Sequence, residues 1–128
     1  MNIGETMKIL LLIIALALFT KDIQAQSISH IETKTKSWYH IYDEAGKLAK
    51  TISTSQGELM GYSVSFYILK HGSFLMTYDI KGKRLHTFAD HEVGEILTVT
   101  GDTFTSRRDP WIYTWSKEGR KIKTQAAE

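Results

Sequence analysis

The sequence repeats itself with a period of about 37 residues, and the repeated positions are those of strands and turns. Gly57–Leu59 corresponds to Gly94–Ile96, and Phe74–Tyr78 corresponds to Trp111–Trp115. A third, partial copy contains the equivalent aromatic segment Trp38–Tyr42. A period of this length is typical of solenoids, propellers and related arrays, so it restricts the fold before any single residue is considered.

Hydrophobic residues within each copy alternate with a period of two, and no stretch after Gln26 keeps the apolar spacing of a helix for three turns. Aromatic and β-branched residues in such an alternation are typical of strands. We therefore expect an all-β fold of eleven short strands in antiparallel meander order. The expected strands are His30–Thr35, Trp38–Tyr42, Lys47–Ile52, Leu59–Ser63, Phe66–Lys70, Phe74–Tyr78, Lys83–Phe88, Ile96–Thr100, Thr103–Arg107, Trp111–Trp115 and Arg120–Thr124.

The motif Tyr-Asp-x-x-Gly-Lys follows the aromatic strand at Tyr42–Lys47 and again at Tyr78–Lys83. An Asp side chain in this position can accept hydrogen bonds from backbone N–H groups further along the turn, and Gly can adopt a left-handed conformation. Ser116 replaces the Asp in the last copy. The motif predicts a tight hairpin turn in every repeat.

The repeats predict one domain, residues 26–128, with a partial repeat at 28–53 and full repeats at 57–89 and 94–126. Four antiparallel strands in about 37 residues are the plan of a propeller blade. Three blades cannot close a ring, so this interpretation requires a homo-oligomer in which two chains contribute about three blades each. The alternative is a single curled meander sheet that forms a barrel or a sandwich.

Residues 1–25 have the pattern of a secretory signal peptide. Lys8 precedes a short apolar run, and Ala25 is followed by polar residues, which predicts cleavage after Ala25. An uncleaved N-terminal anchor and translation from Met7 instead of Met1 remain open. The pattern predicts an exported protein, periplasmic or extracellular, with no membrane span after cleavage.

The composition excludes several classes of function. The chain has no cysteine, which excludes disulfides, thiolate metal sites and a cysteine nucleophile. The formal net charge is +2, with acids and bases mixed along the chain, so we expect no nucleic-acid partner. No motif predicts a cofactor.

The turn motifs at Tyr42–Lys47 and Tyr78–Lys83 resemble the Tyr-Asp repeats of bacterial secreted wall and toxin proteins. They are also similar to the Gly-Lys turns of tryptophan-glycine repeat proteins. Taken whole, the chain resembles the small exported β-repeat proteins of unassigned function in Gram-negative bacteria. This resemblance implies export and a β-repeat fold, and it implies no catalytic residues.

Four residues at the end of the second repeat and in the connection to the third suggest a metal site: His86, Asp90, His91 and Glu92. Imidazole and carboxylate groups bind divalent metals such as zinc. On an extended strand, however, residues 90–92 would alternate between faces and could not converge on one ion. We therefore expect a solvated polar loop and keep a small metal-dependent hydrolase as an alternative function.

An aromatic ladder is the better candidate for a binding site. One ring position of the ladder is occupied by Trp38, Phe74 and Trp111, and the other by Tyr42, Tyr78 and Trp115. The position between the two rings is occupied by His40, Met76 and Tyr113. Such rings either form the core between neighbouring repeats or, if exposed, form a strip for a sugar or a peptide.

These observations favour a binding protein of the cell envelope over an enzyme. The expected ligand is a carbohydrate, a peptide or an envelope protein, held at the aromatic ladder. Two other functions stay open at this stage, namely the metal-dependent hydrolase and a purely structural, homo-oligomeric envelope protein.

Overall fold

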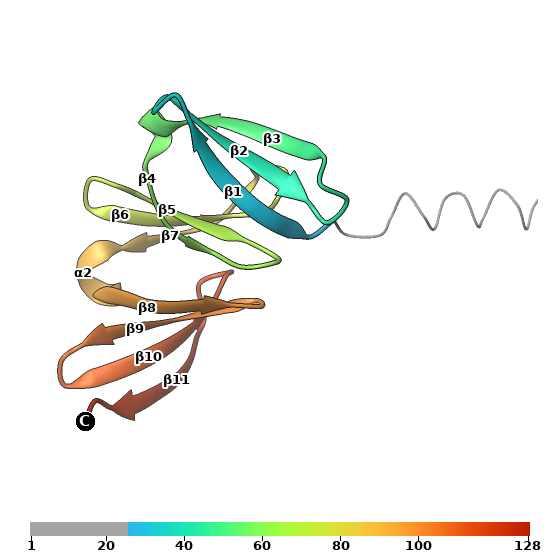
Figure 1. Ribbon diagram of the computed structural model, residues 1–128. Coiled ribbons are helices and arrows are strands. Elements are labelled where there is room, and N and C mark those ends of the chain that lie inside the picture. The colour runs from blue at the N-terminus through green and yellow to red at the C-terminus, as the bar shows by residue number, and fades with distance from the viewer. Residues whose placement is uncertain (1–25) are drawn as a thin grey trace, which may run out of the picture.

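The computed structural model describes residues 26–128, which form three antiparallel sheets in the order of the sequence (Figure 1). The first sheet contains β1 (Ile28–Lys34), β2 (Trp38–Asp43) and β3 (Leu48–Ser53). The second contains β4 (Glu58–Tyr62), β5 (Tyr67–His71), β6 (Phe74–Tyr78) and β7 (Arg84–Ala89). The third contains β8 (Glu95–Thr100), β9 (Thr103–Arg108), β10 (Trp111–Ser116) and β11 (Lys121–Ala126). The predicted signal peptide and the two possible start sites lie outside the described residues.

The prediction of an all-β fold is confirmed, and the eleven strands lie where the alternation placed them, within two residues at each end. The alternative of one curled meander or a closed barrel is wrong for residues 26–128. Hydrogen-bonded pairing stops between β3 and β4 and again between β7 and β8, so each sheet is open and has two edge strands. The sheets instead stack face to face in three layers (Figure 1).

Short helical turns connect the sheets where we expected loops. The 3-10 helix η1 (Thr54–Gln56) precedes β4, and the one-turn helix α2 (Asp90–Val93) precedes β8. Each ends at a glycine, Gly57 or Gly94, whose backbone N–H donates to the first carbonyl of the turn. Turns of three or four residues are too short to produce the apolar periodicity by which helices are recognised in a sequence.

The hairpin turns form as the Tyr-Asp motif predicts. Asp43 Oδ1 accepts hydrogen bonds from the backbone N–H groups of Ala45 and Lys47 at 2.9 and 3.0 Å. Asp79 Oδ1 accepts the two equivalent bonds, both at 2.9 Å. In the last repeat, Ser116 Oγ accepts a single bond from the Arg120 N–H at 3.0 Å.

A β-bulge recurs just before each of these turns. The register between the last two strands of each sheet shifts at Tyr42, Tyr78 and Trp115, which occupy the second ring position of the ladder. A bulge adds one residue to one strand and increases its local twist. The Tyr-Asp pair therefore marks a bulge followed by a side-chain-capped turn, and both features belong to the repeat.

Two hydrophobic cores hold the layers together. The core between the first and second sheets includes Tyr39, Ile41, Leu69 and Tyr78. The core between the second and third sheets includes the side chains of Phe66, Leu75, Phe88, Phe104, Tyr113 and Trp115. The middle sheet is thus buried on both faces, whereas each outer sheet is buried on one.

The repeated glycines allow a close approach between the sheet connections and the second strand of the next sheet. A Cβ atom on Gly57 would lie 2.8 Å from the carbonyl oxygen of Lys70, and a Cβ on Gly94 would clash with the carbonyl of Arg107. Lys70 and Arg107 are equivalent positions, 37 residues apart. A side chain at either glycine would push the connection away from the sheet.

We predict that Gly94→Ala destabilises the protein more than Gly46→Ala does. Both residues have positive φ, 81° and 77°, which costs a non-glycine residue about 1–2 kcal/mol. Gly46 has no atom within 4 Å of the added Cβ, whereas Gly94 meets the backbone of Arg107 and takes a further penalty of about 1–3 kcal/mol. Urea unfolding of both variants measures the difference, and equal losses would contradict the close-packing argument.

A second prediction concerns two buried tyrosines, of which one hydroxyl is hydrogen-bonded and the other is not. The Tyr39 hydroxyl donates to the Gly57 carbonyl at 2.8 Å and accepts from the Leu59 N–H at 3.2 Å. The Tyr67 hydroxyl has no hydrogen-bond partner within the described part of the chain. Tyr39→Phe should therefore lower the free energy of unfolding by about 1–3 kcal/mol, whereas Tyr67→Phe should leave it unchanged or raise it by about 1 kcal/mol.

The same tyrosine predicts a pH dependence. Burial raises the pKa of Tyr67 above the ordinary value of 10.0, because ionisation would place a charge in the core. Its contribution to stability is complete below about pH 10 and is lost as the pH rises further, since only the unfolded chain then releases the proton readily. Unfolding of the wild type above pH 10, compared with Tyr67→Phe, measures this contribution. An identical alkaline decline in both would exclude Tyr67 as its cause.

Candidate binding surface: the aromatic rim

The structure divides the aromatic ladder into an exposed part and a buried part. At the first ring position, Trp38, Phe74 and Trp111 are 46%, 53% and 43% exposed. At the second ring position, Tyr78 and Trp115 are buried and Tyr42 is half-buried. The ladder is therefore neither wholly core nor wholly exposed, because the two ring positions have different surroundings in every repeat.

The buried rings have specific partners. Tyr78 stacks on Tyr67, with ring centroids 5.3 Å apart. Trp115 Nε1 donates a hydrogen bond of 2.9 Å to the buried Ser106 Oγ, and its ring packs edge-on against Phe88 at 5.6 Å. These side chains contribute to the cores between sheets and are not available to a ligand.

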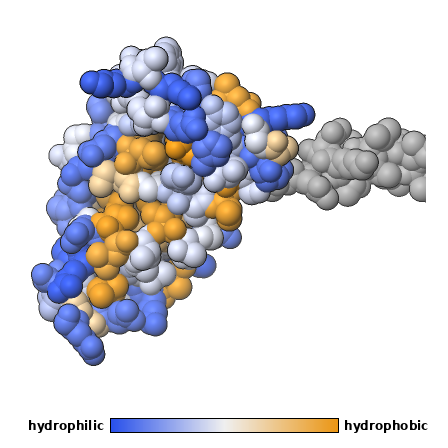
Figure 2. Space-filling view, in the orientation of Figure 1, coloured by the Kyte–Doolittle hydropathy of each residue, from blue (hydrophilic) through white to orange (hydrophobic). Residues whose placement is uncertain are grey.

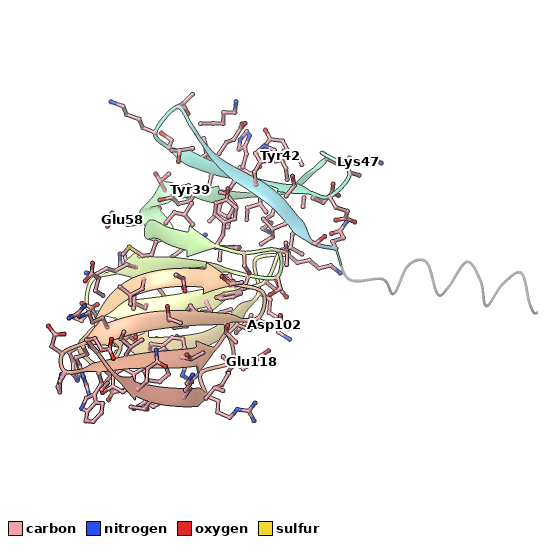
Figure 3. All side chains as sticks on the ribbon, turned by 60° about the horizontal axis from the view of Figure 1, so that its bottom comes forward. Tyr39, Tyr42, Lys47, Glu58, Asp102 and Glu118 are labelled. Atoms are coloured by element: carbon pink, nitrogen blue, oxygen red, sulfur yellow. The ribbon has the colours of Figure 1, made fainter. Side chains whose placement is uncertain are left out.

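At the middle position of the ladder, the burial of the side chain depends on which sheet carries it. Met76 and Tyr113 are buried, because their faces pack on the preceding sheet. His40 is half-buried on the outer face of the first sheet, which no other described sheet covers. The ladder residues of the first repeat therefore occupy an open face, and those of the other repeats occupy closed ones. Figure 3 shows Tyr39 pointing toward β4 and Tyr42 on the other side of the first sheet.

We define the aromatic rim as Trp38, Phe74 and Trp111. Each is the first residue of a strand, β2, β6 or β10, that directly follows a hairpin turn. The three hairpin turns lie at the same end of the stacked sheets, on the left of Figure 1, together with η1 and α2. Stacked sheets are separated by about 10 Å, so the rim presents one exposed ring per layer at about that spacing.

A basic residue faces every ring of the rim across the hairpin. The register pairs Trp38 with Lys34, Phe74 with His71 and Trp111 with Arg108. Lys34, His71 and Arg108 are all exposed and are spaced 37 residues apart. None of the three was predicted as a binding residue, although the period of the repeat aligns them.

The guanidinium of Arg108 is fixed by neighbours on strand β10 and helix α2. It donates to the Tyr113 hydroxyl at 3.1 Å and to the His91 carbonyl at 3.3 Å. It also lies over the Tyr113 ring, 5.4 Å from the centroid, in a cation–π contact. Arg108 is therefore held beside Trp111 without a carboxylate partner among the described residues.

Lys34 has a different environment, because its ammonium forms an ion pair with Glu32 at 3.1 Å. Their hydrogen bond lowers the pKa of Glu32 and raises the pKa of Lys34. Glu32 also lies 3.4 Å from His30, whose ring stacks on Tyr42 at 4.5 Å. The open face of the first sheet thus combines aromatic rings with charged groups and continues into the rim at Trp38.

The structure does not bring the suggested metal ligands together. His86 lies on β7, where its ring packs against Phe88 at 4.6 Å. Asp90, His91 and Glu92 form the one-turn helix α2, and Asp90 pairs with Lys70 at 3.5 Å. The extended conformation that we assumed for residues 90–92 is wrong. Nowhere in residues 26–128 do three histidine or carboxylate side chains converge on a possible ion position.

Comparison of the sequence with models of known protein families finds no match, and comparison with curated proteins finds none either. Between residues 26 and 128, no helix is long and apolar enough to cross a bilayer. Figure 2 shows strongly hydrophilic residues along the left-hand end of the molecule, next to apolar residues over the second and third sheets.

We predict that the two ring positions respond differently to truncation. Trp115→Ala should lower the free energy of unfolding by about 3–5 kcal/mol, because it leaves a cavity between the second and third sheets. Trp38→Ala should cost about 0.5–1 kcal/mol, since the ring is half exposed already. Urea denaturation of both variants tests this division, and a large loss for Trp38→Ala would mean that the rim is structural.

Proposed function

We propose that this protein is an exported, non-catalytic binding protein of the cell envelope that holds an extended carbohydrate along the aromatic rim. The observation that carries the proposal is the exposure of the first ring position in all three repeats. The second ring position supplies the packing between sheets, so the fold itself does not require large rings at the rim. Repeated, half-exposed aromatic residues are typical of surfaces that bind a partner.

The arrangement of the rim suits an extended ligand better than a small compact one. One ring per sheet gives three contacts in a row with a spacing of about 10 Å, which is roughly the length of two linked sugars. Aromatic rings offer flat apolar faces to the C–H faces of sugars, and each contact is weak alone. A ligand that repeats along its length can engage all three rings, and the contacts then reinforce one another.

We further propose that the three sheets are equivalent to propeller blades in an open stack. The innermost strands β4 and β8 lie side by side, and a Cβ on Gly61 would lie 2.8 Å from Val99 Cγ2. A ring completed by a second copy would need apolar outer faces. Those faces carry polar residues at positions that are apolar in the middle sheet, such as Glu32 for Leu69 and Thr105 for Ile68.

The polar outer faces favour an isolated stack over the purely structural, homo-oligomeric alternative. Light scattering after size exclusion of residues 26–128 measures the native mass. A monomer agrees with polar end faces, and a stable dimer would restore the shared ring as the better interpretation.

The binding proposal is tested by affinity gel electrophoresis of the folded protein in gels that contain single soluble polysaccharides, both neutral and acidic. We expect retardation by at least one polysaccharide. The triple variant Trp38→Ala, Phe74→Ala, Trp111→Ala should weaken that binding by about tenfold or more, because it removes three stacking contacts.

The matched control is the double variant Leu97→Ala, Ile122→Ala, which removes apolar side chains that are 43% and 50% exposed outside the rim. Its retardation should equal that of the wild type. No retardation by any polysaccharide, or an equal loss in the control, would reject the proposal. Circular dichroism of both variants verifies that the fold is retained.

A further inference from the structure

We infer that the rim selects an anionic polysaccharide, with a carboxylate of the glycan at the basic residue and a sugar ring on the aromatic residue of each repeat. This inference depends on the proposed binding function and adds the charge of the ligand to it. Its basis is the pairing of Lys34 with Trp38, His71 with Phe74 and Arg108 with Trp111, which recurs in all three repeats.

The paired side chains lie on the same face of each sheet. Residues directly opposite each other in an antiparallel pair have Cβ atoms about 4.5–5.5 Å apart. The ring and the cation of one pair can therefore contact a single sugar residue, one through its C–H face and the other through its acidic substituent. Lysine, histidine and arginine all carry a side-chain N–H that can donate to a carboxylate, so the repeat retains a donor while the residue type changes.

Two carboxylates near the rim are already paired with other basic residues. Asp90 interacts with Lys70 at 3.5 Å, and Asp109 interacts with Arg107 at 2.7 Å. Neither of these two carboxylates forms an ion pair with Arg108. Lys34 forms an ion pair with Glu32, so we expect it to contribute less to binding than Arg108 does.

The spacing of the rim favours a glycan over an acidic peptide. Side chains on one face of an extended peptide repeat about every 7 Å, which does not match rings separated by the sheet spacing of about 10 Å. A polysaccharide with acidic sugars matches this spacing at every second residue. Its rings also supply the apolar faces that a polyglutamate chain lacks.

The test compares polygalacturonate with its methyl ester, which retains the backbone and loses the charge. Isothermal titration calorimetry with the wild-type protein should give at least about tenfold tighter binding to the acid form at low salt. This preference should decline as salt is added, because exposed charges are screened. Equal affinity for both polymers would overturn the inference and leave the proposed function intact.

Variants identify the cations responsible. Arg108→Gln with Lys34→Gln should weaken binding to the acid polymer about five- to tenfold and leave binding to the ester unchanged. The control, Lys47→Gln with Lys83→Gln, removes two exposed charges from the hairpin turns at the other end of the sheets, where Figure 3 labels Lys47. The control should retain wild-type affinity, and an equal loss would mean that binding follows the total charge.

The same titration with polyglutamate tests whether the ligand is an acidic peptide instead of a polysaccharide. Tight binding to polyglutamate without binding to either polysaccharide would identify an acidic peptide as the ligand and would overturn the inference. Binding to none of the three polymers, together with no retardation in any polysaccharide gel, would reject the proposed function as well.

Discussion

Burial of the middle sheet on both faces is the constraint on which the other layers depend. Its strands β5 and β6 contribute Leu69 and Tyr78 to one core and Ile68 and Leu75 to the other. A sheet that is apolar on both faces cannot exist alone in water, so the sheets before and after it are required as covers. The two short connections that end at Gly57 and Gly94 keep those covers close enough to exclude water.

The outer sheets show how the same repeat adapts to a position at the end of the stack. His30 and Glu32 of the first sheet occupy the positions of Tyr67 and Leu69 in the second. On the far face of the third sheet, the hydroxyls of Thr98 and Thr105 are 2.7 Å apart and hydrogen-bonded to each other. Terminal repeats in stacked proteins need polar outer faces for solubility, and these substitutions supply them.

The strands and turns could be predicted from the sequence because their signals are local. Alternation predicted the faces of Trp111–Trp115, and Asp43 with Gly46 predicted a turn whose hydrogen bonds the structure contains.

The exposure of the ladder could not be predicted in the same way. Trp111 and Trp115 lie on one strand and one face, yet only Trp115 lies far enough along the strand to be covered by Phe88. That difference arises from how the sheets overlap, which alternation does not describe. The turns η1 and α2 escaped detection because they are shorter than one period of a helical pattern.

The equivalence of the two connections has a consequence for the size of the molecule. Each joins the last strand of one sheet to the first strand of the next through a short helical turn and a glycine, and each places the next layer in the same way. Nothing in this backbone geometry specifies three layers. A further copy inserted between the second and third sheets would find a matching face on both sides, and it would lengthen the row of rings by one. The number of layers is set by the side chains of the two end faces, so gene duplication could change the number of exposed rings without redesigning the fold.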